Sequence, residues 1–172
     1  MLRNLPALFL SLILGACVNM PTSNVPNGYQ GPFAVISDSV TPRAATTSDI
    51  FYLSAIDGLR IKDSLIATRE GNAGRGRYLY TTMIDRPVLA QAGTFKVFGR
   101  TAYGAPFDEI THTVYQVSGD VRFTPQPSGH YVVRGILGAD YSAVWIEDAE
   151  SRTVMGEKIE IKGSAKLGVF EK

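Results

Sequence analysis

The chain has 172 residues, and 45% of them are apolar, which suffices for one domain with a hydrophobic core. Its 17 basic and 16 acidic side chains nearly balance, so the chain lacks the basic footprint of a nucleic-acid-binding protein. A single cysteine excludes an internal disulfide, so in an oxidising compartment the fold would depend on packing alone.

The first seventeen residues have the organisation of a secretory signal peptide. Arg3 is positive, residues 5–14 are mainly apolar, and two small residues precede Cys17. The apolar run is about half the length of a transmembrane helix. An ordinary signal peptide is the alternative, but Leu14 would be a poor −3 residue for its cleavage. The run Leu-Gly-Ala-Cys resembles the lipobox of bacterial lipoproteins, which implies cleavage between Ala16 and Cys17.

The lipobox resemblance implies that Cys17 carries a covalent lipid, and no other cofactor is expected. Bacterial lipoproteins normally carry three acyl chains, and several chains give the durable attachment that one chain cannot. No Asp occupies the second mature position, which is Val18. For a Gram-negative source this implies the outer membrane, with the domain facing the periplasm. A Gram-positive source would place the domain on the outer face of the cell membrane.

Residues 17–49 are expected to be the lipidated cysteine followed by a mostly flexible tether. Between residues 18 and 32, prolines alternate with Asn, Ser and Gly, and no apolar periodicity is present. Residues 33–36 could form a first short strand, and residues 38–48 return to loop composition. We therefore divide the chain into a signal peptide (1–16), the lipidated tether (17–49) and a folded domain (50–172).

From Ile50 onwards the apolar residues recur with a period of two, which is typical of half-buried strands. The clearest example is 115–124, in which the odd-numbered residues are predicted to face the core and Gly119 to mark a bulge or bend. Further candidate strands are 50–56, 77–84, 94–101, 131–136, 142–146 and 157–162. The pattern predicts an all-β fold, an antiparallel sandwich of about seven to nine short strands.

Residues typical of turns and of a helix N-cap lie between these predicted strands. Asp57-Gly58 predicts a tight turn, and residues 125–129 (PQPSG) predict a hairpin loop. One short helix near 63–71, capped by Asp63, is expected, with a strand over 65–69 as the alternative. Trp145 lies on a strand that is apolar on both faces and is predicted to be the centre of the core.

Several short motifs resemble a group of small bacterial envelope lipoproteins with transthyretin-like or immunoglobulin-like sandwich domains. They are Asp57-Gly58, the segment 87–93 leading into 94–97, and the run Gly-His-Tyr-Val-Val at 129–133. The resemblance covers roughly residues 50–148. Most members of this group have no assigned activity, so the resemblance implies a fold and a location but no catalytic residues.

No sequence motif indicates catalysis or metal binding. His112 and His130 lack compact metal-ligand spacing, although a site built from both and a distant carboxylate stays open. No Gly-x-Ser-x-Gly motif supports a serine nucleophile. In the acidic pairs Asp108-Glu109 and 147–148, neighbouring strand residues would point to opposite faces and would not converge. The chain is therefore not expected to be an enzyme.

Two loops supply candidate interaction residues. The glycine-rich loop 71–77 carries Arg75 and Arg77, which either face water or contact an anionic partner. Tyr103 and Phe107 lie in a loop with Gly and Pro, where they either bind a partner or pack at the end of a sheet.

The sequence thus predicts a membrane-anchored lipoprotein with a non-catalytic sandwich domain. We expect it to bind a protein partner or to serve as an accessory subunit in the cell envelope. The alternative is a ligand-binding module for a glycan, a lipid or another anionic ligand.

Overall fold

The computed structural model describes residues 20–172, so the predicted signal peptide, the predicted cleavage site and Cys17 lie outside the described residues. The strands are β1 (Phe33–Ser37), β2 (Ser39–Ala44), β3 (Thr47–Ile56), β4 (Leu59–Arg60), β5 (Asp85–Leu89), β6 (Gly93–Tyr103), β7 (Gln116–Phe123), β8 (His130–Ile136), β9 (Tyr141–Asp148) and β10 (Val154–Lys162). The helices are α1 (Ser64–Asn72), α2 (Pro106–Thr111) and the 3-10 turn η1 (Val169–Glu171).

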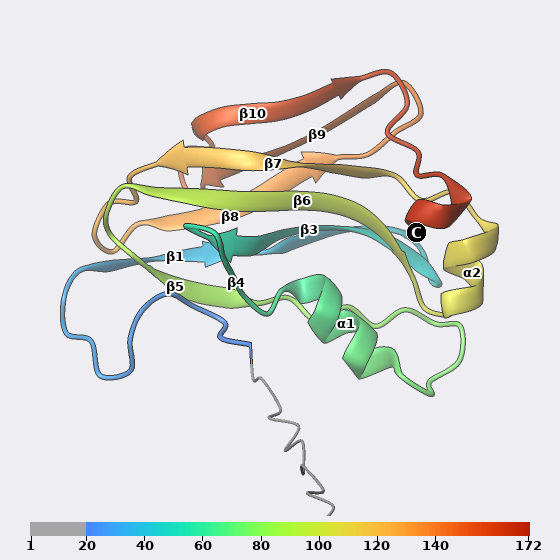
Figure 1. The fold of residues 1–172 in the computed structure, drawn as a ribbon, viewed down its shortest axis with the longest axis horizontal. Coiled ribbons are helices and arrows are strands. Elements are labelled where there is room, and N and C mark those ends of the chain that lie inside the picture. Colours follow the sequence, from blue (N-terminus) through green and yellow to red (C-terminus); the bar gives the residue numbers. More distant parts are fainter. Residues whose placement is uncertain (1–19) are drawn as a thin grey trace, which may run out of the picture.

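The strands form two packed sheets, which confirms the predicted sandwich (Figure 1). One sheet has the order β10-β9-β8-β1-β5, and the other has the order β2-β3-β6-β7 with β4 paired to β3. All pairings are antiparallel except β1 with β8, which is parallel, so the first sheet is mixed. The chain crosses between the sheets at Asp38, immediately after β1.

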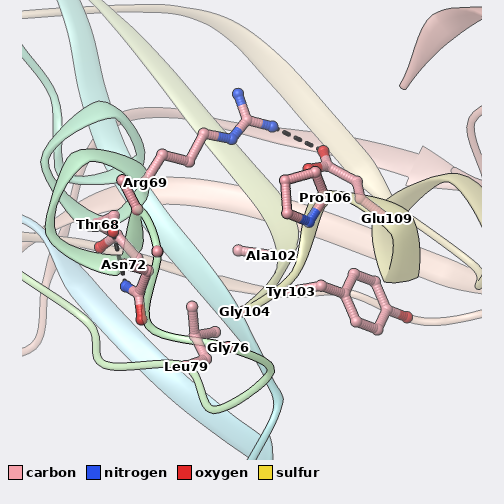
Figure 2. Close-up of a pocket in the computed structure, with 12 residues that line it drawn as sticks. Thr68, Arg69, Asn72, Gly76, Leu79, Ala102, Tyr103, Gly104, Pro106 and Glu109 are labelled. Atoms are coloured by element: carbon pink, nitrogen blue, oxygen red, sulfur yellow. Dashed lines mark hydrogen bonds and ion pairs between the residues drawn. The ribbon is translucent and has the colours of Figure 1, made fainter.

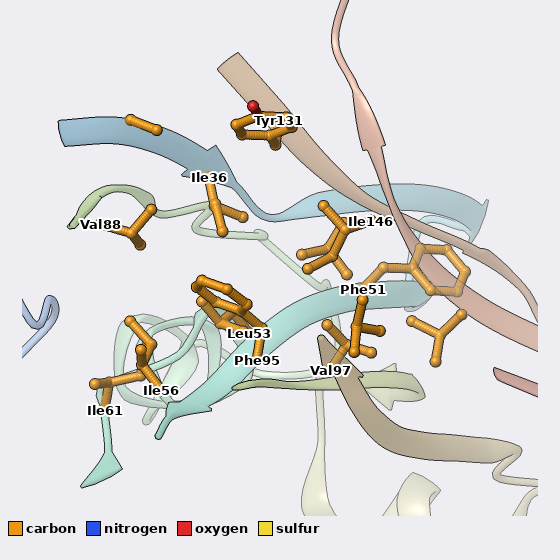
Figure 3. Packing of buried hydrophobic residues seen from close by; sticks show 14 of the residues in the cluster. Ile36, Phe51, Leu53, Ile56, Ile61, Val88, Phe95, Val97, Tyr131 and Ile146 are labelled. Atoms are coloured by element: carbon orange, nitrogen blue, oxygen red, sulfur yellow. The ribbon is translucent and has the colours of Figure 1, made fainter. Parts of the chain in front are cut away.

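The core lies between the sheets and has Phe51 at a tight junction (Figure 3). A Cβ at Gly135 in β8 would lie 2.3 Å from the Phe51 ring, and one at Gly99 in β6 would lie 2.9 Å from it. Both positions must therefore be glycine for the ring to fit between the sheets. Val117 and Val121 face this core from β7, as the alternation predicts. Gly119 keeps the strand register and makes room for Ile159 of β10, so it is a point of close approach and not a bulge.

The prediction that the tether extends mostly flexible to residue 49 is wrong, because residues 33–49 contain β1, β2 and the start of β3. The polar composition of residues 38–48 is typical of a loop, but most of these residues lie in strands in the structure. β2 contains Pro42 and is the edge strand of its sheet, where a residue without an N–H is tolerated.

Residues 20–32, which we call the N-terminal strap, also contact the domain. The Ser23 hydroxyl donates to the Pro87 carbonyl at 2.6 Å, and the Leu89 amide donates to the Asn24 side chain at 3.2 Å. The Lys62 amide donates to the Pro21 carbonyl at 2.8 Å. Two of these three bonds lie along β5, so the strap lies on the edge of that sheet and is not a free linker.

Three other predictions are corrected. Residues 125–129 join β7 to β8 in the opposite sheet, so they form a crossover and not a hairpin loop. Residues 77–84 form no strand, because side chains of α1 satisfy much of their backbone. Trp145 lies on the outer face of its sheet, since its neighbours Val144 and Ile146 point into the core.

A buried carboxylate ties the sheets to α1. Asp38 accepts hydrogen bonds from the Leu53 amide at 2.9 Å and from the Ser64 hydroxyl at 2.6 Å, and it pairs with Arg86. The side chains of Asp38 and Arg86 are fully buried, and Arg86 also donates to the Leu53 carbonyl. Burial raises the pKa of Asp38 to about 6, and Arg86 opposes that shift more strongly than the hydrogen bonds do.

Asp38→Ala should lower the free energy of unfolding by about 3–5 kcal/mol, because it leaves Arg86 and several donors buried without an acceptor. Asp38→Asn should cost less, since it keeps an acceptor oxygen at a place where burial already favours the neutral acid. Urea denaturation measures both changes. The exposed Asp120→Ala serves as control and should shift stability by no more than about 0.5 kcal/mol. Equal losses for Asp38→Ala and Asp120→Ala would contradict the structural role of Asp38.

Candidate interaction site at the end of the sandwich

The site is built on α1 and the segment that follows it. Asp63 caps the helix by accepting from the Ile66 amide at 2.9 Å, as predicted. The chain then turns through Gly74 and Gly76, which both have positive φ. It returns alongside α1, where the Asn72 side chain bonds both the amide and the carbonyl of Tyr80.

The second wall comes from the end of β6 and from α2. Gly104 lies against the backbone of Arg77, and a Cβ there would be 2.2 Å from the Arg77 carbonyl oxygen. The Arg77 guanidinium donates two hydrogen bonds to the buried Asp108 carboxylate, at 3.0 and 2.7 Å. This pairing raises the pKa of Arg77. The two loops that the sequence singled out therefore meet at one end of the sandwich.

Between these walls lies an apolar cavity of about 580 Å³, which we call the end pocket (Figure 2). This volume lies within the usual range for ligand sites. Its lining combines apolar side chains with three polar side chains of α1 and one carboxylate of α2, and includes Thr68, Arg69, Asn72, Leu79, Tyr103 and Glu109.

A charged trio lies at one wall of the end pocket, with Arg69 and Glu109 in its lining and Arg100 behind them. One oxygen of Glu109 accepts from Arg69 at 2.7 Å and from Arg100 at 2.7 Å. Arg100 also donates to Gln116 and is about nine-tenths buried, whereas Arg69 is half exposed. The Arg100 Nε is buried and has no partner within residues 20–172. One carboxylate thus accepts from two guanidiniums, so the trio has a net positive charge, and Arg69 is its more exposed arginine.

The surface beside the pocket exposes several large apolar side chains. Phe107 is 71% exposed and Ile110 is 55% exposed, and their spacing of three places them on one face of α2. Phe170 of η1 is fully exposed. Lys172 donates to the carbonyls of Ile110 and His112, so η1 lies beside α2 (Figure 1). We call Phe107, Ile110 and Phe170 the apolar rim.

The predicted interaction residues differ in availability. Phe107 and Arg75 are exposed. Arg77 is exposed but held by Asp108, and Tyr103 is half-buried and donates to the Thr113 carbonyl at 2.8 Å. The predicted cleavage and lipidation residues, Ala16 and Cys17, lie outside the described residues. Sequence reasoning missed Arg69 and Arg100, because isolated arginines carry no motif.

The outer face of the first sheet offers a weaker site. Trp145 donates to Glu147 at 2.9 Å, and the Lys158 ammonium lies 4.6 Å from its ring centroid. Arg134 and Arg152 pair with the same Glu147. The indole is therefore partly covered by charged neighbours and does not form an open aromatic platform.

The part of the chain from residue 20 to 172 contains no group of three or more His, Cys, Asp or Glu side chains arranged to hold a metal ion. Within the same residues, no helix has the length and apolarity required to cross a bilayer. Comparison with protein-family models, with curated proteins and with solved structures gives no match for this chain.

Gly104→Ala should displace the 77–78 backbone and distort the end pocket, because no side chain fits 2.2 Å from a carbonyl oxygen. We expect a loss of about 1–3 kcal/mol in unfolding free energy, the usual cost of overpacking. Gly71→Ala is the matched control, since a Cβ at this position of α1 would make an ordinary 3.6 Å contact with the Thr82 hydroxyl. It should leave stability unchanged or raise it by up to about 1 kcal/mol. Thermal unfolding compares the two; an unperturbed Gly104→Ala would refute the close approach of the loops.

Proposed function

We propose that this protein is a lipid-anchored bacterial envelope lipoprotein whose non-catalytic sandwich domain binds a protein partner. The apolar rim beside the end pocket carries the proposal. Exposed aromatic and aliphatic side chains next to a concave apolar pocket are typical of a surface that accepts anchor residues from a partner. The lipobox resemblance of residues 14–17 supports the envelope location and the lipid anchor.

The two edges of the first sheet favour an end-on partner over one that adds a strand to that sheet. The strap lies along β5, as its bonds to Pro87 and Leu89 show. At the other edge of that sheet, β10 has a register shift between Met155 and Ile159 and alternating charges over 157–162. Irregular, charged edges of this kind oppose strand addition.

The charged side chains near the rim support a non-catalytic role. Asp108 is buried and held by Arg77, and Glu109 is held by two arginines. These carboxylates hold loops and helices together, and the described pairings leave neither of them free to act as a general acid or base.

In vivo crosslinking followed by capture of the tagged, lipidated protein tests the proposal. Phe107→Ser together with Ile110→Ser should sharply reduce recovery of a stoichiometric partner, because both substitutions remove exposed apolar contacts without opening the core. Val154→Ser is the control, since Val154 is also exposed but lies on β10. Equal recovery from the rim variant and the control would contradict docking at the rim.

Cys17→Ser should abolish fatty-acid labelling and leave the precursor uncleaved or mislocalised, because the hydroxyl cannot replace the thiol in the lipobox. Metabolic labelling with a fatty acid and membrane fractionation measure the change. Retained labelling and retained outer-membrane fractionation of Cys17→Ser would refute the lipid anchor.

A second candidate function is the binding of a small amphiphilic anion, and the end pocket favours it. The pocket offers about 580 Å³ with an apolar lining, and Arg69 supplies a half-exposed positive charge beside it. Native mass spectrometry of the protein extracted from membranes separates the two candidates. A co-purifying lipid-sized molecule that disappears in Arg69→Gln, but not in Arg75→Gln, would favour ligand binding.

A further inference from the structure

The N-terminal strap fixes where the chain leaves the folded domain. Its first bond joins the Pro21 carbonyl to the Lys62 amide at 2.8 Å, just before α1 begins. The next bonds, from Ser23 to Pro87 and from Leu89 to Asn24, hold the strap against β5. The segment that could act as a free linker therefore ends near residue 20.

The remaining linker is short. Cys17 lies four residues before Pro21, and a fully extended chain covers at most about 3.5 Å per residue, so the two residues lie within about 14 Å. The polar headgroup layer itself is about 5–8 Å thick on each side of a bilayer. A lipid on Cys17 therefore leaves less than about 10 Å between the headgroups and Pro21.

The surface around Pro21 is suited to contact with headgroups. β4 ends two residues before Lys62, and its Leu59 is 53% exposed. Arg60 is exposed and forms no ion pair within 4.0 Å among residues 20–172, whereas Lys62 is paired with Glu70 at 2.6 Å. Leu59 and Arg60 point to opposite faces of the short strand β4, so an exposed leucine and an unpaired arginine lie on its two sides. A strand edge of this kind suits an interface of acyl chains and anionic headgroups, where each basic residue contributes about 1 kcal/mol.

We propose that the surface formed by Pro21, Leu59, Arg60 and Lys62 lies against the lipid headgroups, so that the domain is held at the bilayer in one orientation. This inference rests on the lipidation of Cys17 proposed above. In Figure 1 the chain enters the described structure beside β4 and α1, and β10 lies at the opposite edge of the molecule. The apolar rim on α2 and η1 lies at the end of the sandwich, away from this entry point, where a partner could reach it.

The test uses the full lipidated protein in vesicles of phosphatidylethanolamine and phosphatidylglycerol. A lipidated Cys17 has no free thiol, so Leu59→Cys supplies the only site for a fluorophore. Glu157→Cys, an exposed position on β10, is the matched control. A nitroxide on the lipid headgroup should quench the probe at position 59 several-fold more than the probe at position 157.

A variant with a longer linker tests whether the short distance between Cys17 and Pro21 is what fixes the orientation. Twelve Gly and Ser residues inserted between Asn19 and Met20 add about 20 Å of mean reach. They should lower quenching at position 59 toward the level at position 157 while leaving lipidation intact. Arg60→Gln should weaken quenching on anionic vesicles only.

The outcomes separate this inference from the anchor itself. Equal quenching at positions 59 and 157 in a protein that carries fatty acid on Cys17 would overturn the fixed orientation and leave the lipoprotein proposal intact. Strong quenching at position 59 that persists with the longer linker would overturn the claim that the short chain between Cys17 and Pro21 fixes the orientation. Absence of fatty acid on Cys17 would overturn the proposed anchor, and this inference with it.

Discussion

The buried carboxylate of Asp38 is the constraint on which the rest of the structure depends. It lies where the chain crosses from one sheet to the other, and its donors come from β3, α1 and β5. A fully buried charge is tolerated only when its partners are in place, because an uncompensated ion costs several kcal/mol. The carboxylate therefore couples the closure of the sandwich to the position of the helix, in a way that apolar contacts, which are not directional, could not.

The position of the end pocket depends on Asp38 and its hydrogen-bond partners. Asp38 holds Ser64, the first residue of α1, and the Ser64 hydroxyl also accepts from the Ile84 amide. The helix and the returning segment are therefore fixed at one end by the same group. At the other end, Asn72 fixes Tyr80, and Arg77 on Asp108 secures the loop to α2. A surface pocket is thus positioned by a chain of polar contacts that begins in the core.

The sequence predicts the features that depend on local pattern, and it misses those that depend on which surface is covered. Alternation along 115–124 correctly places Val117 and Val121 in the core, and Asp63 correctly caps α1. Alternation cannot show which face of an all-apolar strand is buried, so the sequence places Trp145 on the wrong face of its sheet. Residues 77–84 have strand composition, but they fold back along the preceding helix α1, and their hydrogen-bond partners are side chains of that helix. The sharing of Glu109 by Arg69 and Arg100 likewise arises only from folding.

The sequence also does not show that the N-terminal strap is held on the domain, and this affects how the domain would lie at a membrane. Proline, serine and asparagine are read as a flexible linker because they do not form a regular element. The same side chains can nevertheless hold a chain on a sheet edge, as Ser23 and Asn24 do on β5. A lipid anchor at the end of a free linker restricts only distance, whereas one followed at once by a fixed strap also restricts orientation. If Cys17 is lipidated, the bonds of the strap therefore decide which surfaces face the bilayer and which stay available to a partner.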